Sequence, residues 1–167
     1  MMLNKKKNII LIIIFFIILL SIISALMIEY VLGHKPCGLC LYERIPYFLS
    51  ALLIIKIFFF KKYEKITLLI LFLIFMFSAL LAFYHFGIEQ GFFEESFVCS
   101  VENQSNILSK EQLLKELNKN IISCKEVTFR ILGLSLAAIN TILSVLLSII
   151  FLKLFFNYGS SSTSQYK

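Results

Sequence analysis

The chain has 167 residues, of which 59% are hydrophobic and only 16% are charged, and its mean hydropathy is +0.90. Soluble domains are roughly 45–50% apolar and about 25% charged. The composition therefore excludes a disordered chain, a coiled coil and a soluble globule, whose small core has no room for so many large apolar side chains.

Four segments have the ~20 apolar residues that a helix needs to cross a bilayer. The first follows Lys5, Lys6 and Lys7, but its apolar run is about twice as long as that of a signal peptide, and no small-residue cleavage site follows. We predict an all-α membrane protein, a four-helix transmembrane bundle within residues 1–157, followed by a disordered tail at residues 158–167. The predicted spans are residues 9–32, 41–60, 67–87 and 131–156, and the alternative for the second is a re-entrant or interfacial helix.

The basic residues sort by side of the membrane. The flanks on the side of the N-terminus hold nine basic residues and one glutamate, a net charge of +8, whereas the other flanks hold seven basic residues and nine glutamates, a net charge of −2. Since short basic flanks stay in the cytoplasm, we predict cytoplasmic termini and two outer loops at residues 33–40 and 88–130. The total charge of +6 then faces anionic lipid, and no nucleic-acid partner is expected.

The first outer loop contains a C-x-x-C motif, Cys37-Gly-Leu-Cys40. Pro36 suits the first position of a helix, and cysteines three apart on one turn lie at disulfide-bonding distance. The helix dipole and Arg44, one turn after Cys40, favour the thiolate that attacks disulfides. We interpret the motif as redox-active. A structural disulfide and half of a zinc site are the alternatives, but zinc normally takes four ligands, so no metal is predicted.

The third predicted span ends in Tyr84-His-Phe-Gly-Ile-Glu-Gln-Gly91, on the same side as the C-x-x-C motif. His85 and Glu89 place two titratable side chains where this helix leaves the bilayer. Polar and aromatic residues commonly anchor helices at the interface, so anchoring is the alternative to a functional role.

Two more cysteines, Cys99 and Cys124, lie in the second outer loop. Between them, the S-x-x-Q capping box at residues 109–112 and the apolar residues after it predict a short amphipathic helix on the outer membrane surface. A disulfide between these cysteines would be either a structural cross-link worth roughly 3 kcal/mol or an exchangeable bond offered to an incoming protein thiol. The spacing leaves both open.

These motifs resemble the DsbB family of inner-membrane disulfide-forming proteins. The resemblance covers about residues 10–155 and rests on C-x-L-C-x-x-E-R at residues 37–44, on residues 85–91, on the two loop cysteines and on residues 132–140. It implies a quinone-dependent protein disulfide oxidoreductase in the bacterial inner membrane, with periplasmic cysteine loops, that reoxidises a DsbA-like thioredoxin-fold thiol oxidase. Cys124 lacks a proline-rich turn after it, which bears on how the partner docks.

The resemblance also implies roles for the cysteines. Cys37 and Cys40 would be the pair in contact with a membrane quinone. Cys99 and Cys124 would form the disulfide that oxidises the partner, with Cys99 as the residue that forms the mixed disulfide.

For the cofactor, the resemblance implies ubiquinone or menaquinone. Arg44 would lie beside the quinone and favour its reduced, anionic states, while His85 and Glu89 would line or support the quinone end. The sequence contains no G-x-G-x-x-G fingerprint for a dinucleotide or flavin, which leaves a lipid-soluble oxidant. We expect a monomer.

Three alternatives remain. A vitamin K epoxide reductase-like protein also has a C-x-x-C motif, but late in its chain. A thiol exporter would reverse the electron flow, but such carriers tend to bury their cysteines within spans. The third is a non-enzymatic membrane scaffold with two structural disulfides.

Overall fold

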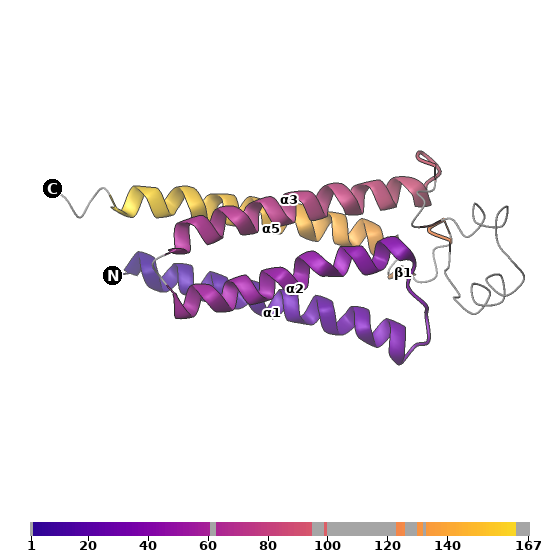
Figure 1. Ribbon diagram of the computed structural model, residues 1–167, viewed down its shortest axis with the longest axis horizontal. Helices are drawn as coiled ribbons and strands as arrows, with labels where there is room; N and C mark the ends of the chain where they lie inside the picture. Colours follow the sequence, from indigo (N-terminus) through magenta and orange to yellow (C-terminus); the bar gives the residue numbers. More distant parts are fainter. Residues whose placement is uncertain are drawn as a thin grey trace, which may run out of the picture.

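Four long helices lie side by side in the computed structural model, which describes residues 2–60, 63–94, 99, 123–125, 130–131 and 133–162 (Figure 1). They are α1 (Met2–Tyr30), α2 (Gly38–Phe59), α3 (Glu64–Glu89) and α5 (Leu136–Ser162). Each is long and apolar enough to cross a membrane. The predicted four-helix transmembrane bundle is confirmed, whereas the predicted surface helix lies outside the described residues.

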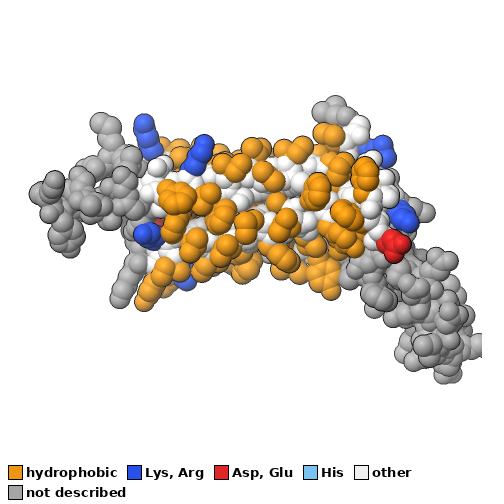
Figure 2. All heavy atoms as spheres, turned by 90° about the horizontal axis from the view of Figure 1, so that it is seen from above, with side chains coloured by type: hydrophobic (Ala, Val, Ile, Leu, Met, Phe, Trp, Pro, Cys, Tyr) orange, Lys and Arg blue, Asp and Glu red, His pale blue; other side chains and the backbone are white. Residues whose placement is uncertain are grey.

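The outside of the bundle is apolar, as a lipid-facing surface must be. Hydrophobic side chains cover its middle, and Lys and Arg side chains gather near its two ends (Figure 2). Large side chains such as Phe16 and Phe77 are about two-thirds exposed. A water-soluble protein rarely leaves so large an apolar surface uncovered, so this surface suits a hydrocarbon environment.

The core of the bundle draws on all four helices. Leu11 and Ile18 from α1 pack in one buried cluster with Phe75 from α3 and Phe151 from α5. The Phe75 ring stacks on Phe151 and meets Tyr47 of α2 edge to face, each at a centroid distance of 5.6 Å. Aromatic contacts of this kind add van der Waals packing, which holds helices together where lipid removes the hydrophobic driving force.

The fourth helix begins five residues later than predicted. Two short strands before it, β1 (Arg130–Ile131) and β2 (Leu134–Ser135), instead pair in an antiparallel hairpin. Gly133 has a φ of 86°, a left-handed conformation that glycine adopts without strain. Ser135 Oγ then accepts a hydrogen bond from the Ala138 amide at 3.2 Å, as an N-cap does. Apolar composition alone does not reveal this turn.

Other boundaries also differ from the prediction by a few residues. α2 begins at Gly38 instead of residue 41, because Cys37 serves as its N-cap. α5 continues to Ser162, five residues into the predicted tail, since extending a formed helix costs far less than starting one.

The beginning of α1 and the end of α5 lie at the same end of the bundle, opposite β1 (Figure 1). At that end an ion pair between Lys7 and Glu64 joins α1 to α3. The hairpin, the start of α2 and the end of α3 meet at the other end, where the cysteines are found.

Candidate functional site

All four cysteines are paired and share one buried cluster. Disulfides join Cys37 to Cys40 and Cys99 to Cys124, with Cα–Cα distances of 5.2 and 5.3 Å. Cys37, Cys99 and Cys124 are almost fully buried, and Cys40 packs against them. Two disulfides that pack together are placed for exchange with each other, since exchange requires a thiolate to reach a sulfur atom of the other bond.

The start of α2 positions the C-x-x-C motif. Cys37 is the N-cap, with extended backbone angles, and its Sγ accepts a hydrogen bond from the Cys40 amide at 3.2 Å. An amide donor and the positive end of the helix dipole both stabilise a negative charge on this sulfur. The local geometry thus favours a thiolate at Cys37 when the disulfide is reduced.

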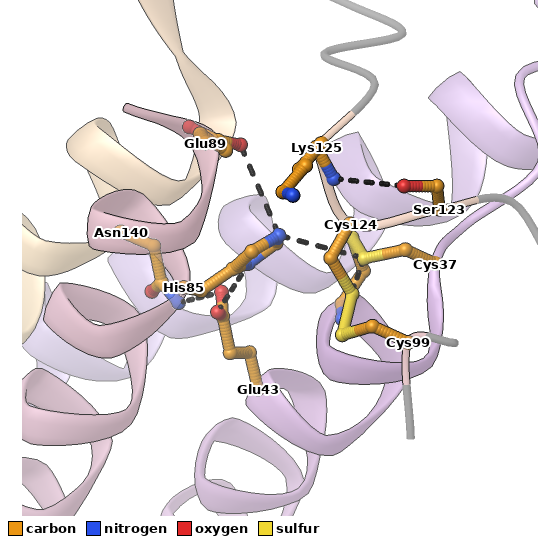
Figure 3. Close-up of a disulfide and its surroundings, with 10 residues drawn as sticks. Cys37, Glu43, His85, Glu89, Cys99, Ser123, Cys124, Lys125 and Asn140 are labelled. Atoms are coloured by element: carbon orange, nitrogen blue, oxygen red, sulfur yellow. Dashed lines mark hydrogen bonds and ion pairs between the residues drawn. A yellow bond between two sulfur atoms is a disulfide. The ribbon is translucent and has the colours of Figure 1, made fainter. Parts of the chain in front are cut away.

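A buried histidine faces that sulfur, and a buried glutamate contacts the other nitrogen of the histidine ring (Figure 3). His85 Nδ1 lies 2.7 Å from Glu43 Oε1, and His85 Nε2 lies 3.5 Å from Cys37 Sγ. Because a carboxylate only accepts hydrogen bonds, Nδ1 carries the proton and the lone pair of a neutral imidazole is on Nε2. The arrangement can accept a proton from the Cys37 thiol and hold the resulting imidazolium against Glu43.

The carboxylate of Glu43 is fixed by a polar network inside the bundle. Its Oε2 accepts a hydrogen bond from Asn140 Nδ2 at 2.6 Å, and Asn140 Oδ1 accepts one from the Tyr47 hydroxyl. The Tyr47 hydroxyl also lies within hydrogen-bond distance of the Ser144 hydroxyl, at 3.3 Å. The Ser144 hydroxyl in turn lies 3.1 Å from the Ser78 hydroxyl. Polar groups this deep in a membrane protein are costly without partners, so the network fixes the relative positions of α2, α3 and α5.

Replacing Asn140 with leucine is expected to destabilise the fold by about 1–2 kcal/mol. The change leaves one carboxylate oxygen of Glu43 and the Tyr47 hydroxyl without their Asn140 partner, and buried groups that lose a partner cost more than the bond itself gained. Denaturant unfolding in detergent micelles measures the effect. Thr141→Val is the control, because among the described residues the Thr141 hydroxyl bonds only within its own helix, to the Ala137 carbonyl. Equal stability of the two variants would contradict the prediction.

Arg44 lies on a different side of α2 from Glu43. Its guanidinium pairs with Glu29 near the end of α1, so it ties α1 to α2. The sequence predicts that Arg44, one helical turn after Cys40, lies on the same face of the helix as Cys40. In the structure the ionic contact of Arg44 is with Glu29.

Glu89 approaches the site from the last turn of α3. Its Oε1 lies 3.8 Å from His85 Nε2, and its side chain is only 6% exposed. Its other oxygen, Oε2, is buried without a hydrogen-bond partner among the described residues. The structure therefore brings His85 and Glu89 together beside the C-x-x-C motif, as the sequence pattern suggested.

An apolar groove of about 660 Å³ runs between α2 and α3. Three residues of its wall, Leu39, Leu81 and Tyr84, also pack against the cysteine cluster. The rest of the wall is formed by Tyr42, Ile45, Pro46, Leu49, Ile70, Leu73, Ile74 and Phe77. The groove thus leads from the lipid-facing surface of the two helices to the C-x-x-C motif.

Sequence reasoning missed Glu43 and Tyr47 as parts of the site. Asn140 is a strongly polar residue within the fourth predicted apolar span. A polar residue in such a position is a signal of function, but the sequence does not show which residue it contacts. Glu43 lies in the C-x-L-C-x-x-E-R motif next to the more conspicuous Arg44. One helical position separates the two side chains, and the packing of α2 turns Glu43 toward His85 and Arg44 toward Glu29.

Two comparisons with known proteins bear on the family of this chain. The model of the protein family described as "Disulfide bond formation protein DsbB" matches residues 7–154. The chain is also similar to "Uncharacterized protein RP370" of Rickettsia prowazekii (strain Madrid E), with 29% identity over 144 residues that cover 85% of this chain and 83% of the relative. Because the family match runs through all four helices and includes all four cysteines, the chain belongs to the DsbB family of disulfide bond formation proteins.

Proposed function

We propose that the protein is a protein dithiol:quinone oxidoreductase that reoxidises a DsbA-like thioredoxin-fold partner and passes the electrons to ubiquinone or menaquinone. The observation that carries this proposal is the packing of two disulfides in one buried cluster that borders an apolar groove. A scaffold protein has no need of a second disulfide against the first, nor of a groove that reaches it.

The relay begins at the second disulfide. A partner thiolate attacks Cys99, the Cys99–Cys124 bond breaks, and a mixed disulfide forms; the second partner thiol then displaces Cys99 and leaves the partner oxidised. The Cys99–Cys124 dithiol next reduces the Cys37–Cys40 disulfide by the same exchange, so two electrons and two protons move inward at each stage. Because Cys99 is buried in the structure, partner attack requires Cys99 to become exposed.

His85 and Glu43 act at the inner stage. When the Cys37–Cys40 bond opens, His85 Nε2 accepts the proton of the Cys37 thiol, and Glu43 stabilises the imidazolium. The thiolate is the species that gives up electrons and exchanges disulfides. His85 thus links proton transfer to electron transfer at the C-x-x-C motif, with Glu89 as a second carboxylate 3.8 Å from the same nitrogen.

The groove between α2 and α3 suits a quinone and its isoprenoid tail. Its lining is almost entirely apolar, and it ends at residues that pack against the buried cysteine cluster. Pro46 has no amide proton, so the Tyr42 carbonyl one turn earlier has no helical donor and offers an acceptor to a quinol hydroxyl. A quinone bound there would take two electrons and two protons from the C-x-x-C dithiol. Arg44 is not among the residues that line this groove, and its guanidinium pairs with Glu29 of α1. Its role beside the quinone, which the resemblance implies, therefore stays a prediction.

The same proposal covers orientation. The cysteine end of the bundle faces the periplasm and both termini face the cytoplasm of a bacterial inner membrane, in agreement with the net charge of +8 on the flanks at the other end. Among the described residues, both disulfides and the residues that line the groove belong to one chain, and the proposal is of a monomer.

A coupled assay tests the proposal. The purified protein is mixed with a reduced thioredoxin-fold dithiol oxidase and a soluble quinone, and quinone absorbance is followed. We expect many turnovers per chain, with one quinone reduced for each partner disulfide formed. The absence of turnover with an intact quinone pool and a reduced partner would refute it.

Filling the groove is expected to weaken quinone use selectively. Leu73→Trp places a bulky ring in the wall of the groove and should raise the quinone KM about 10-fold, because overpacking an apolar site costs roughly 1–3 kcal/mol. Exchange with the partner in a single turnover should be unchanged. Leu80→Trp is the matched control, since Leu80 is 63% exposed and is not among the groove residues. An equal KM for the two variants would place the quinone elsewhere.

A further inference from the structure

The C-x-x-C motif and His85 together have the geometry of a metal site. One ligand atom from each of Cys37, Cys40 and His85 lies within 4.8 Å of the others. His85 Nε2 and Cys37 Sγ are 3.5 Å apart. In a tetrahedral zinc site, with Zn–S near 2.3 Å and Zn–N near 2.0–2.1 Å, nitrogen and sulfur ligands are also roughly 3.5 Å apart. In the disulfide form the two sulfurs bond to each other, so neither is available as a thiolate ligand.

The histidine is oriented as a metal-bound histidine usually is. Its Nδ1 proton is donated to Glu43 Oε1 at 2.7 Å, which turns the lone pair of Nε2 toward Cys37. Carboxylate–histidine–zinc arrangements fix the tautomer and the ring in this way. Asn140 in turn holds Glu43, so the nitrogen ligand is already in position before any ion binds.

Glu89 is the candidate for a fourth ligand. It lies outside the 4.8 Å cluster of Cys37, Cys40 and His85, so its carboxylate would have to move toward the ion in order to bind it. Its Oε1 lies 3.8 Å from His85 Nε2, and its Oε2 is buried without a hydrogen-bond partner among the described residues. A buried carboxylate oxygen without a partner is costly, and coordination of a cation would satisfy it. Two thiolates, one imidazole and one carboxylate form a ligand set that zinc accepts.

We propose that reduction of the Cys37–Cys40 disulfide creates a binding site for a thiophilic divalent cation, zinc above all. Cys37, Cys40 and His85 form the site, and Glu89, whose Oε1 lies 3.8 Å from His85 Nε2, is the candidate for a fourth ligand. Two electrons and two protons convert the disulfide to two thiols, and the ion then displaces both thiol protons without any change in its own oxidation state. The bound ion occupies both sulfurs and the His85 lone pair, so it traps the reduced dithiol and blocks its reoxidation. The site depends only on reduction of the disulfide, by any reductant, and therefore goes beyond the proposed relay.

The charge of the ligand set predicts which ions bind. Two thiolates and a carboxylate more than neutralise a divalent ion, and soft sulfur ligands favour zinc over the hard ions magnesium and calcium. The oxidised protein should bind none of these ions at this position.

The experiment uses full-length protein in detergent micelles with Cys99 and Cys124 both changed to serine, so that only the C-x-x-C thiols remain. The protein is reduced with a phosphine, freed of reductant without oxygen, and titrated with Co²⁺ and then Zn²⁺. We expect one ion per chain, thiolate-to-cobalt charge-transfer bands with the ligand-field spectrum of a tetrahedral site, and bleaching of both by zinc. The disulfide form of the same protein should show none of these signals, and excess Mg²⁺ should not compete.

Single substitutions identify the other ligands. His85→Ala should weaken zinc binding about 100-fold or more and Glu89→Gln about 10-fold or more, since the loss of even a supporting residue costs roughly 10–100-fold. The matched controls are His34→Ala, at the only other histidine of the chain, and Glu94→Gln, at an exposed glutamate. Both should bind zinc as the parent does. Circular dichroism confirms that each variant keeps its helices.

Two results would overturn the proposal. One is no tetrahedral cobalt spectrum in the reduced parent protein, which requires no further variant. The other is equal zinc affinity in His85→Ala and His34→Ala, which would assign the ion to the cysteines alone. Neither partner nor quinone is present in the titration, so its outcome is independent of the relay assay.

Discussion

Replacing Cys40 with alanine is expected to reduce steady-state quinone reduction by about 10³-fold or more, because loss of one member of a catalytic unit removes nearly the whole effect of that unit. The Cys99–Cys124 disulfide remains in this variant. It should therefore oxidise one equivalent of reduced partner and then stop, which rapid-quench thiol counting can measure.

Cys99→Ala should fail in the opposite way. The partner should no longer be oxidised at all, whereas a small dithiol that reduces the Cys37–Cys40 disulfide directly should still support quinone reduction. If both disulfides were only structural, the two variants would be less stable, but they would not differ in which step of electron transfer they lose. Repeated turnover by Cys40→Ala would contradict the proposed order of the relay.

The second large effect is expected for Glu43→Gln. The carboxylate holds the proton of His85 on Nδ1, whereas a glutamine amide can donate to Nδ1 and so place the imidazole proton on Nε2, facing Cys37. His85 then cannot accept the thiol proton. Loss of a positioned base, or of its correct tautomer, typically costs about 10²–10⁴-fold, and we expect a fall of about 10²-fold in the rate of electron transfer from the C-x-x-C dithiol.

The pH dependence separates this role from a structural one. Without the base, the Cys37 thiolate must form by loss of a proton to solvent, so the rate of Glu43→Gln should rise roughly tenfold per pH unit while the thiol stays protonated. The wild-type rate should rise less steeply over the same range. Glu94→Gln is the matched control and should follow the wild type. A variant that is slow at every pH by the same factor would show that Glu43 only supports the fold.

The amino-acid sequence by itself determined the four spans and their number, because the free energy of placing a helix in lipid is close to a sum over its residues. It also determined the pairing distance within the C-x-x-C motif, since three residues of one helical turn fix it. The predicted beginning of the last helix was wrong, because the turn at Gly133 does not change the average hydropathy of the segment.

Only the tertiary structure decided which side chains meet. Adjacent residues on one helix point about 100° apart, so whether Glu43 or Arg44 faces the cysteines depends on the rotation of α2 against its neighbours. That rotation places Glu43 between His85 and Asn140, which are 42 and 97 positions away in the sequence. It also turns Arg44 toward α1, where Arg44 forms an ion pair with Glu29. The four cysteines can be read from the sequence, but the contacts of the proposed base His85 with Cys37 and Glu43 are contacts between helices, which no local pattern encodes.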